Sequence, residues 1–190
     1  MECGKLEGVC KCQSEVLTTE RIYLVDLKVV KNSGGVKAYD QEPEYEALLL
    51  DNQGQTAVEL VAFEENAFEI RKGKYDKQCE CALYPYDSND ASWLLFVEMK
   101  YTYNEFNIQR DDWHKRAVEQ IRSTVNFLRS KGAIAEEERL NAIISFPKLS
   151  SFSSWLADYV RNELKVDGIN ARCTNKATIV NRDILILAEV

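Results

Sequence analysis

A glutamate and a lysine at the end of an apolar run are the residues of this sequence best suited to chemistry. In the run WLLFVEMKY, Glu98 and Lys100 are separated by a single residue. Side chains alternate between the two faces of a β-strand, so a strand here directs both to one side, together with Leu94 and Phe96. Burying a carboxylate and an ammonium group is costly unless another group compensates. The pair is therefore either a structural ion pair or part of an active site.

A second carboxylate, Glu80, lies in the preceding strand-like segment, QCECALY. A segment rich in turn-forming residues joins the two, so together they predict an antiparallel hairpin. If Glu80 and Glu98 share a face of this hairpin, the carboxylates repel each other unless one binds a proton or a cation lies between them. A divalent ion such as Mg²⁺ prefers oxygen ligands of this kind. Lys100 can then orient an attacking water or offset charge that develops on a phosphate.

An amphipathic helix is predicted to follow, over residues 111–131, and Asp111 or Asp112 can cap its N-terminus. Gln120 lies on the flank of the apolar stripe, so its amide can face the end of the sheet. The single histidine, His114, is expected to be a solvated residue near the start of the helix. A single helical histidine predicts no nucleophilic triad.

An acid on one strand, Glu-x-Lys on the next and a glutamine on the following helix resemble the PD-(D/E)xK nuclease superfamily, which includes restriction endonucleases and Holliday-junction resolvases. The resemblance covers about residues 57–146. It implies a restriction endonuclease-like core, in which helices flank a mixed β-sheet. It also implies hydrolysis of phosphodiester bonds in DNA, with Mg²⁺ or Mn²⁺ as the cofactor.

The resemblance also assigns roles to individual residues. Glu80 takes the place of the first acidic metal ligand, and Glu98 is the second metal ligand. Lys100 is the catalytic lysine, and Gln120 matches the polar residue on the helix that follows.

Two features of the acidic positions leave alternatives open. The family's first ligand is normally aspartate, and the extra methylene of Glu80 moves its carboxylate by about 1.5 Å. Because Mg²⁺ demands nearly ideal octahedral geometry, either the site accommodates glutamate, or Asp76 supplies the ligand, or catalysis is lost. Asp76 lies in the turn-like segment GKYDK, which favours Glu80. The family often adds an upstream acid, for which Glu65 and Glu69 are both candidates.

Two other classes of protein compete with the nuclease. The first is a catalytically inactive relative that uses the same fold as an interaction or nucleic-acid-binding module. The second is a zinc-binding module built on the pairs Cys10-x-Cys12 and Cys79-x-Cys81. Structural zinc sites usually have about two to four residues between paired ligands, so Cys79 and Cys81 are expected in the core instead. The roles of Cys10, Cys12 and the nearby Cys3 stay open.

The charge pattern bears on the partner. A net charge of −7 argues against a protein that coats nucleic acid or lies on a membrane surface. The predicted helix nevertheless has a local excess of basic residues that can contact a phosphate backbone, among them Lys115, Arg116 and Arg122. An ordinary solvated helix face is the competing interpretation. Nucleic acid, with DNA favoured, is therefore the expected partner.

Length and composition predict one α/β domain. With 190 residues, of which 45% are hydrophobic and 29% charged, the chain can bury a substantial core. Predicted strands precede an alternation of helices and strands, which indicates a mixed sheet. Residues 1–56 are expected to elaborate a nuclease-like core at 57–190. The sequence shows neither a membrane-spanning run nor a signal peptide, so we expect a cytoplasmic protein, for which a homodimer is a plausible assembly.

Overall fold

A six-stranded mixed sheet forms the centre of the computed structural model, which describes residues 6, 8–32, 34–86 and 93–188. In spatial order its strands are β1 (Cys12–Leu17), β5 (Val58–Phe63), β8 (Cys81–Pro85), β9 (Leu94–Met99), β10 (Leu140–Ser145) and β11 (Ile169–Cys173). Neighbours from β1 to β9 pair antiparallel, whereas β9, β10 and β11 run parallel. The predicted α/β class with a mixed sheet is confirmed.

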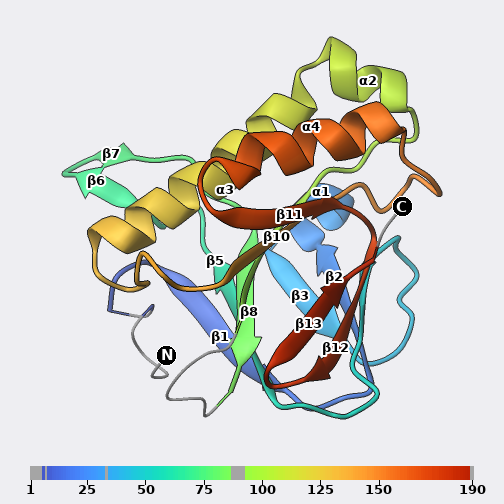
Figure 1. The fold of residues 1–190 in the computed structure, drawn as a ribbon, viewed down its shortest axis with the longest axis horizontal. Coiled ribbons are helices and arrows are strands. Elements are labelled where there is room, and N and C mark those ends of the chain that lie inside the picture. Colours follow the sequence, from blue (N-terminus) through green and yellow to red (C-terminus); the bar gives the residue numbers. More distant parts are fainter. Residues whose placement is uncertain (1–5, 7, 33, 87–92, 189–190) are drawn as a thin grey trace.

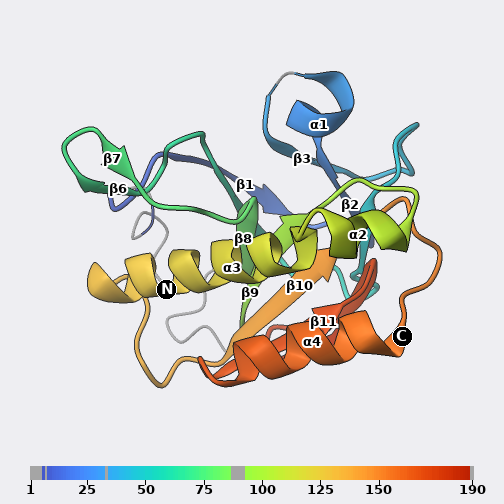
Figure 2. The same cartoon turned by 90° about the horizontal axis from the view of Figure 1, so that it is seen from above.

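Helices cover one face of this sheet. They lie in the long crossover connections that parallel pairs of strands need. The connections contain α2 (Glu105–Arg110) and α3 (Trp113–Ser130) after β9, and α4 (Ser154–Lys165) after β10. Helices α3 and α4 lie side by side over the sheet (Figures 1 and 2).

A second, five-stranded sheet covers the opposite face. In spatial order its strands are β13 (Ile184–Leu187), β12 (Lys176–Asn181), β4 (Leu48–Asp51), β2 (Arg21–Asp26) and β3 (Val36–Tyr39). It joins strands from both ends of the chain, while β1 belongs to the central sheet. The expected boundary at residue 57 therefore does not separate the two sheets.

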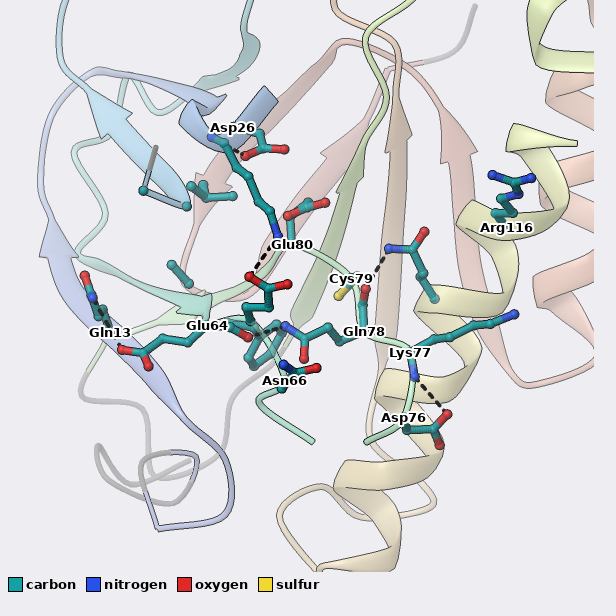
Figure 3. A pocket seen from close by; sticks show the side chains of 18 of the residues that line it. Gln13, Asp26, Glu64, Asn66, Asp76, Lys77, Gln78, Cys79, Glu80 and Arg116 are labelled. Carbon is teal, nitrogen blue, oxygen red and sulfur yellow. Dashed lines mark hydrogen bonds and ion pairs between the residues drawn. The ribbon is translucent and has the colours of Figure 1, made fainter. Parts of the chain in front are cut away.

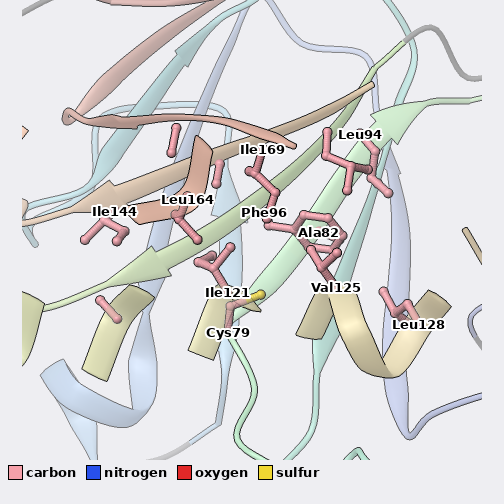
Figure 4. Packing of buried hydrophobic residues seen from close by; sticks show 14 of the residues in the cluster. Cys79, Ala82, Leu94, Phe96, Ile121, Val125, Leu128, Ile144, Leu164 and Ile169 are labelled. Atoms are coloured by element: carbon pink, nitrogen blue, oxygen red, sulfur yellow. The ribbon is translucent and has the colours of Figure 1, made fainter. Parts of the chain in front are cut away.

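Strand β9 contributes side chains to both cores, which explains its continuous apolar run. Leu94 and Phe96 pack on the helix side, where Ile121 and Val125 of α3 meet the sheet (Figure 4). Leu95 and the other alternate residues of the strand pack between the two sheets. A strand that is covered on both faces reads as an unbroken hydrophobic segment.

Three smaller elements project from these layers. Helix α1 (Leu27–Lys31) follows β2, and strands β6 (Glu69–Arg71) and β7 (Lys74–Tyr75) form a small two-stranded sheet of their own (Figure 2). Among the described residues, no helix combines the length and the apolar character that crossing a bilayer requires.

The helix predicted at residues 111–131 differs from the observed one at its start. Asp112 has a φ of 54°, a left-handed conformation that interrupts the helix between α2 and α3. Its side chain makes no capping hydrogen bond. His114 is only 4% exposed, so the prediction of a solvated histidine was wrong. Its Nδ1 lies 3.0 Å from the carbonyl oxygen of Ile108, and the ring packs edge-on against Tyr159 of α4.

Replacing Phe96 with alanine should lower the free energy of unfolding by about 3 to 5 kcal/mol, because a fully buried ring in the helix-side core leaves a cavity. Urea denaturation followed by circular dichroism measures this change. Phe106→Ala is the matched control, since its side chain is 64% exposed and its removal should change stability by less than about 0.5 kcal/mol. Equal losses in the two variants would contradict the packing.

Candidate active site

Glu98 lies near the end of β9 and faces the helix side, as the alternation of the strand predicts. Its side chain is 0% exposed, and Lys100 forms an ion pair with its Oε1. Gln120 of α3 donates a hydrogen bond from Nε2 to Oε2 of Glu98 at 3.2 Å. Lys100 Nζ donates in turn to Oε1 of Gln120 at 3.0 Å. The three side chains therefore form a closed triangle of polar contacts.

Helix α3 also fixes the segment that leads into β8. Gln120 Nε2 donates to the carbonyl oxygen of Gln78 at 2.7 Å. One turn later, Thr124 Oγ1 accepts a hydrogen bond from the backbone N–H of Cys79 at 2.9 Å. These contacts set the position of the next residue, Glu80, relative to the triangle.

Glu80 precedes the regular part of β8 rather than lying within it. Its backbone N–H donates to the carbonyl oxygen of Val97 at 3.0 Å, and its carbonyl oxygen accepts from Phe63 N–H at 3.0 Å. The pairing of Cys81 with Val97 in β9 places Glu80 beside Glu98. The half-buried Glu80 side chain lines a pocket.

Asp26 is a site residue that sequence reasoning missed. It ends β2 of the second sheet, is 2% exposed, and caps α1 by accepting the N–H of Lys28 at Oδ1 over 2.9 Å. Its own N–H donates to the hydroxyl oxygen of Tyr101 at 3.1 Å, which ties the end of β2 to the residue after Lys100. The available signal was an aspartate at the end of the apolar segment RIYLVD.

The electrostatics of the site show an excess of carboxylate. Burial, with repulsion from Glu98, raises the pKa of Glu80 to about 8. Burial raises the pKa of Glu98 to about 7, although Lys100 opposes the shift, and burial also raises the pKa of Asp26. For Lys100, burial lowers the pKa but the Glu98 carboxylate outweighs it, so the net shift is upward. Such a cluster either retains protons or attracts a cation.

A pocket of about 860 Å³ opens beside these residues. Asp26 at the end of β2 and Glu80 just before β8 line it, and so does Arg116 of α3 (Figure 3). Gln120 also lines the pocket, whereas the fully buried Glu98 is not among the lining residues. The charged side chains of the lining are five acids and three bases: Asp26, Glu64, Glu65, Asp76, Glu80, Lys28, Lys77 and Arg116.

The predicted upstream acids lie away from the triangle. Glu65 is exposed on the pocket rim and forms an ion pair with Lys28 at 3.3 Å. Glu69 is exposed on β6, where Oε1 accepts the N–H of Gly73 at 2.8 Å. Asp76 directly follows β7 rather than lying in a turn, lines the pocket and accepts the N–H of Lys77. The additional acid is instead Asp26, which lines the same pocket as Glu80 and whose charge raises the pKa of Glu80.

The three basic residues predicted to contact substrate have different surroundings. Arg116 is exposed, lines the pocket and forms no ion pair with any described residue. Lys115 pairs with Asp112 at 2.8 Å. Arg122 pairs with Asp167 at 2.8 Å. The latter two lie outside the pocket lining.

The cysteines supply packing. Cys79 packs in the helix-side core and Cys81 between the sheets, whereas a regular strand would direct both to one side. The cause is the irregular backbone before β8, which interrupts the alternation. Burial raises the pKa of Cys10, whose Sγ donates to the carbonyl oxygen of Leu6, to about 12. Cys3 lies outside the described residues.

The fit of this site to a divalent cation depends on its donors. Asp26, Glu80 and Glu98 present hard oxygen ligands, and burial is the main cause of their raised pKa values, to which repulsion between carboxylates adds for Glu80 and Glu98. Buried Oε1 of Glu98 receives no hydrogen bond of regular geometry from the described part of the chain, only the Lys100 ion pair. In their present positions, no three His, Cys, Asp or Glu side chains of the described residues form a metal-binding group. Ion binding at Glu98 thus requires Lys100 to release Oε1.

Comparisons of this chain with models of known protein families, with curated proteins and with solved structures found no match.

Proposed function

We propose that this protein hydrolyses phosphodiester bonds in DNA with a divalent cation, Mg²⁺ or Mn²⁺, bound by Glu80 and Glu98. The observation that carries the proposal is the ion pair of Lys100 with the buried Glu98, with Glu80 opposite Glu98 on the neighbouring chain segment and with the pKa values of both glutamates raised by burial. The same arrangement of acid, Glu-x-Lys and helix glutamine is implied by the resemblance to the PD-(D/E)xK superfamily. Its presence on a mixed sheet supports that relationship.

Each side chain has a distinct role in the proposed reaction. A bound divalent ion supplies positive charge that polarises the scissile phosphate and lowers the pKa of water. Lys100, once it leaves Glu98, orients the attacking water or stabilises the negative charge on the pentavalent phosphorus. Gln120 positions Lys100 and Glu98 through the hydrogen bond that it makes with each of them. Asp26 adds an oxygen donor on the pocket wall.

The direct test is to titrate Mg²⁺ and Mn²⁺ into the wild type and Glu98→Ala by calorimetry, and to assay cleavage of plasmid and single-stranded DNA. We expect the wild type to bind metal and cut DNA, and Glu98→Ala to do neither. A wild-type protein that binds no metal and cuts nothing would end the enzyme hypothesis.

The alternative is a catalytically inactive module with the same fold that binds nucleic acid or another protein. One observation favours it: both carboxylate oxygens of Glu98 are already engaged by Lys100 and Gln120. DNA binding without metal uptake would support this alternative.

Cytoplasmic location and a homodimer complete the proposal. All five cysteines that the structure describes are free thiols, as expected in a reducing compartment. Sedimentation of the purified chain tests the dimer, and fractionation of cells that express it tests the location.

Replacing Arg116 with alanine should raise KM for DNA about five- to tenfold and leave kcat nearly unchanged. Arg116 lies on the pocket lining one helical turn before Gln120 and forms no ion pair with a described residue. A phosphate contact of this kind affects binding in the ground state. The logarithmic salt dependence of binding should also become shallower by about 0.9. Lys115→Ala is the control, because Lys115 is paired outside the pocket. A fall in kcat with unchanged KM would contradict this role.

A further inference from the structure

An exposed aromatic surface with a lysine borders the candidate active site. Tyr103 is 73% exposed, and Lys148 Nζ lies 4.2 Å from the centroid of its ring. The same Nζ lies 5.9 Å from the ring of Tyr101. We call these three residues, Tyr101, Tyr103 and Lys148, the aromatic platform.

The platform is tied directly to the site. Tyr101 and Tyr103 follow Lys100 in the chain, and the Tyr101 hydroxyl accepts the backbone N–H of Asp26. The N–H of Lys100 donates to the carbonyl oxygen of Ser145, at the end of β10 and three residues before Lys148. Tyr101 therefore connects the platform to the site, to Lys100 along the chain and to Asp26 by a hydrogen bond.

The chemistry of the platform selects a ligand with both aromatic and anionic parts. A freely exposed tyrosine ring offers a face for stacking, and Lys148 forms no ion pair within the described part of the chain. A nucleotide strand provides bases and phosphates in this combination, and stacking on aromatic side chains accepts any base. In a duplex the base faces are covered by neighbouring pairs, so only an unpaired strand can stack on Tyr103.

The pocket carries an excess of negative charge, which repels every nucleic acid to some degree. Five acids against three bases line it, which opposes the dense charge of a duplex backbone more than that of one strand. The segment at Glu64–Asn66 and the segment at Asp76–Gln78 wall one part of the pocket, and Asp26 lies on another (Figure 3). We propose that the aromatic platform binds the bases and phosphates of a single-stranded nucleic acid and guides that strand to Lys100. The guiding role rests on the proposed function, whereas the binding does not.

Fluorescence anisotropy in EDTA tests the binding without any metal. A short fluorescein-labelled oligothymidylate and a mixed-sequence duplex of equal length are titrated with wild type, Tyr103→Ala, Tyr103→Phe and Lys148→Ala. We expect the wild type to prefer the single strand, Tyr103→Ala to weaken its binding about tenfold, and Tyr103→Phe to retain it. Lys148→Ala should reduce the logarithmic salt dependence by about 0.7. Tyr75→Ala on β7 and Lys165→Ala at the end of α4 are controls that should change neither value.

Several outcomes would overturn the proposal. They are equal affinity for the duplex, no oligothymidylate binding at low salt, and binding that Tyr103→Ala leaves unchanged. Binding of a glutamate-rich peptide in place of the oligonucleotide would assign the surface to a protein partner. If Tyr103-dependent binding is found but the wild type never cuts DNA, only the proposed catalysis fails. If DNA is cut equally well by Tyr103→Ala, only the guiding role of the platform fails.

Discussion

Replacing Lys100 with methionine should lower kcat for DNA cleavage by about 100- to 1000-fold. Methionine preserves much of the apolar stem but removes the ammonium group, and the loss of one charged donor to a transition state has this magnitude. Metal binding should persist, because Lys100 no longer competes for Oε1 of Glu98. The measurements are single-turnover cleavage and calorimetric titration with Mn²⁺.

Lys77→Met is the matched control for this effect. Lys77 also lines the pocket, but it forms an exposed ion pair with Glu119 and lies outside the triangle of Glu98, Lys100 and Gln120. Its replacement should leave kcat within about threefold of the wild type, because an exposed ion pair contributes little free energy. Wild-type activity in Lys100→Met, with the fold intact by circular dichroism, would remove Lys100 from the mechanism.

The metal-free protein should lose stability as the pH rises from about 5 to 8, and Mg²⁺ or Mn²⁺ should restore it. The native state holds a proton on Glu80 up to a pKa of about 8 and on Glu98 up to about 7, whereas the ordinary pKa of a glutamate side chain is 4.5. The unfolded chain therefore binds fewer protons in this interval, so the free energy of unfolding falls with pH. The loss should reach about 3 kcal/mol, allowing for solvent that reaches Glu80.

Thermal unfolding across this pH range, with and without Mn²⁺, measures the effect. Protons and metal compete for the same carboxylates, so metal affinity should rise with pH while the metal-free Tm falls. Glu80→Gln imitates the protonated state and should flatten the profile and weaken metal binding. Glu119→Gln is the control, because Lys77 lowers the pKa of that exposed group and its titration ends below this range. A Tm that rises with pH in the metal-free wild type would contradict the shared acidic site.

The amino-acid sequence by itself determined the local parts of this site. Period-two alternation in β9 places Glu98 on the same face as Phe96, and α3 brings Gln120 to that face. These relations follow from the geometry of one strand and one helix, so they need no knowledge of distant segments. The mixed α/β class followed in the same way from the order of the elements.

Only the tertiary structure decided which distant residues join the site. Asp26 reaches Glu80 because the second sheet packs on β9, and nothing local to β2 specifies that docking. Arg122 of α3 pairs with Asp167 in the turn after α4, and His114 is buried because aromatic side chains of α4 cover it. Contacts of this kind depend on how separate layers pack, and a pattern of apolar residues shows which face is buried but not which partner buries it.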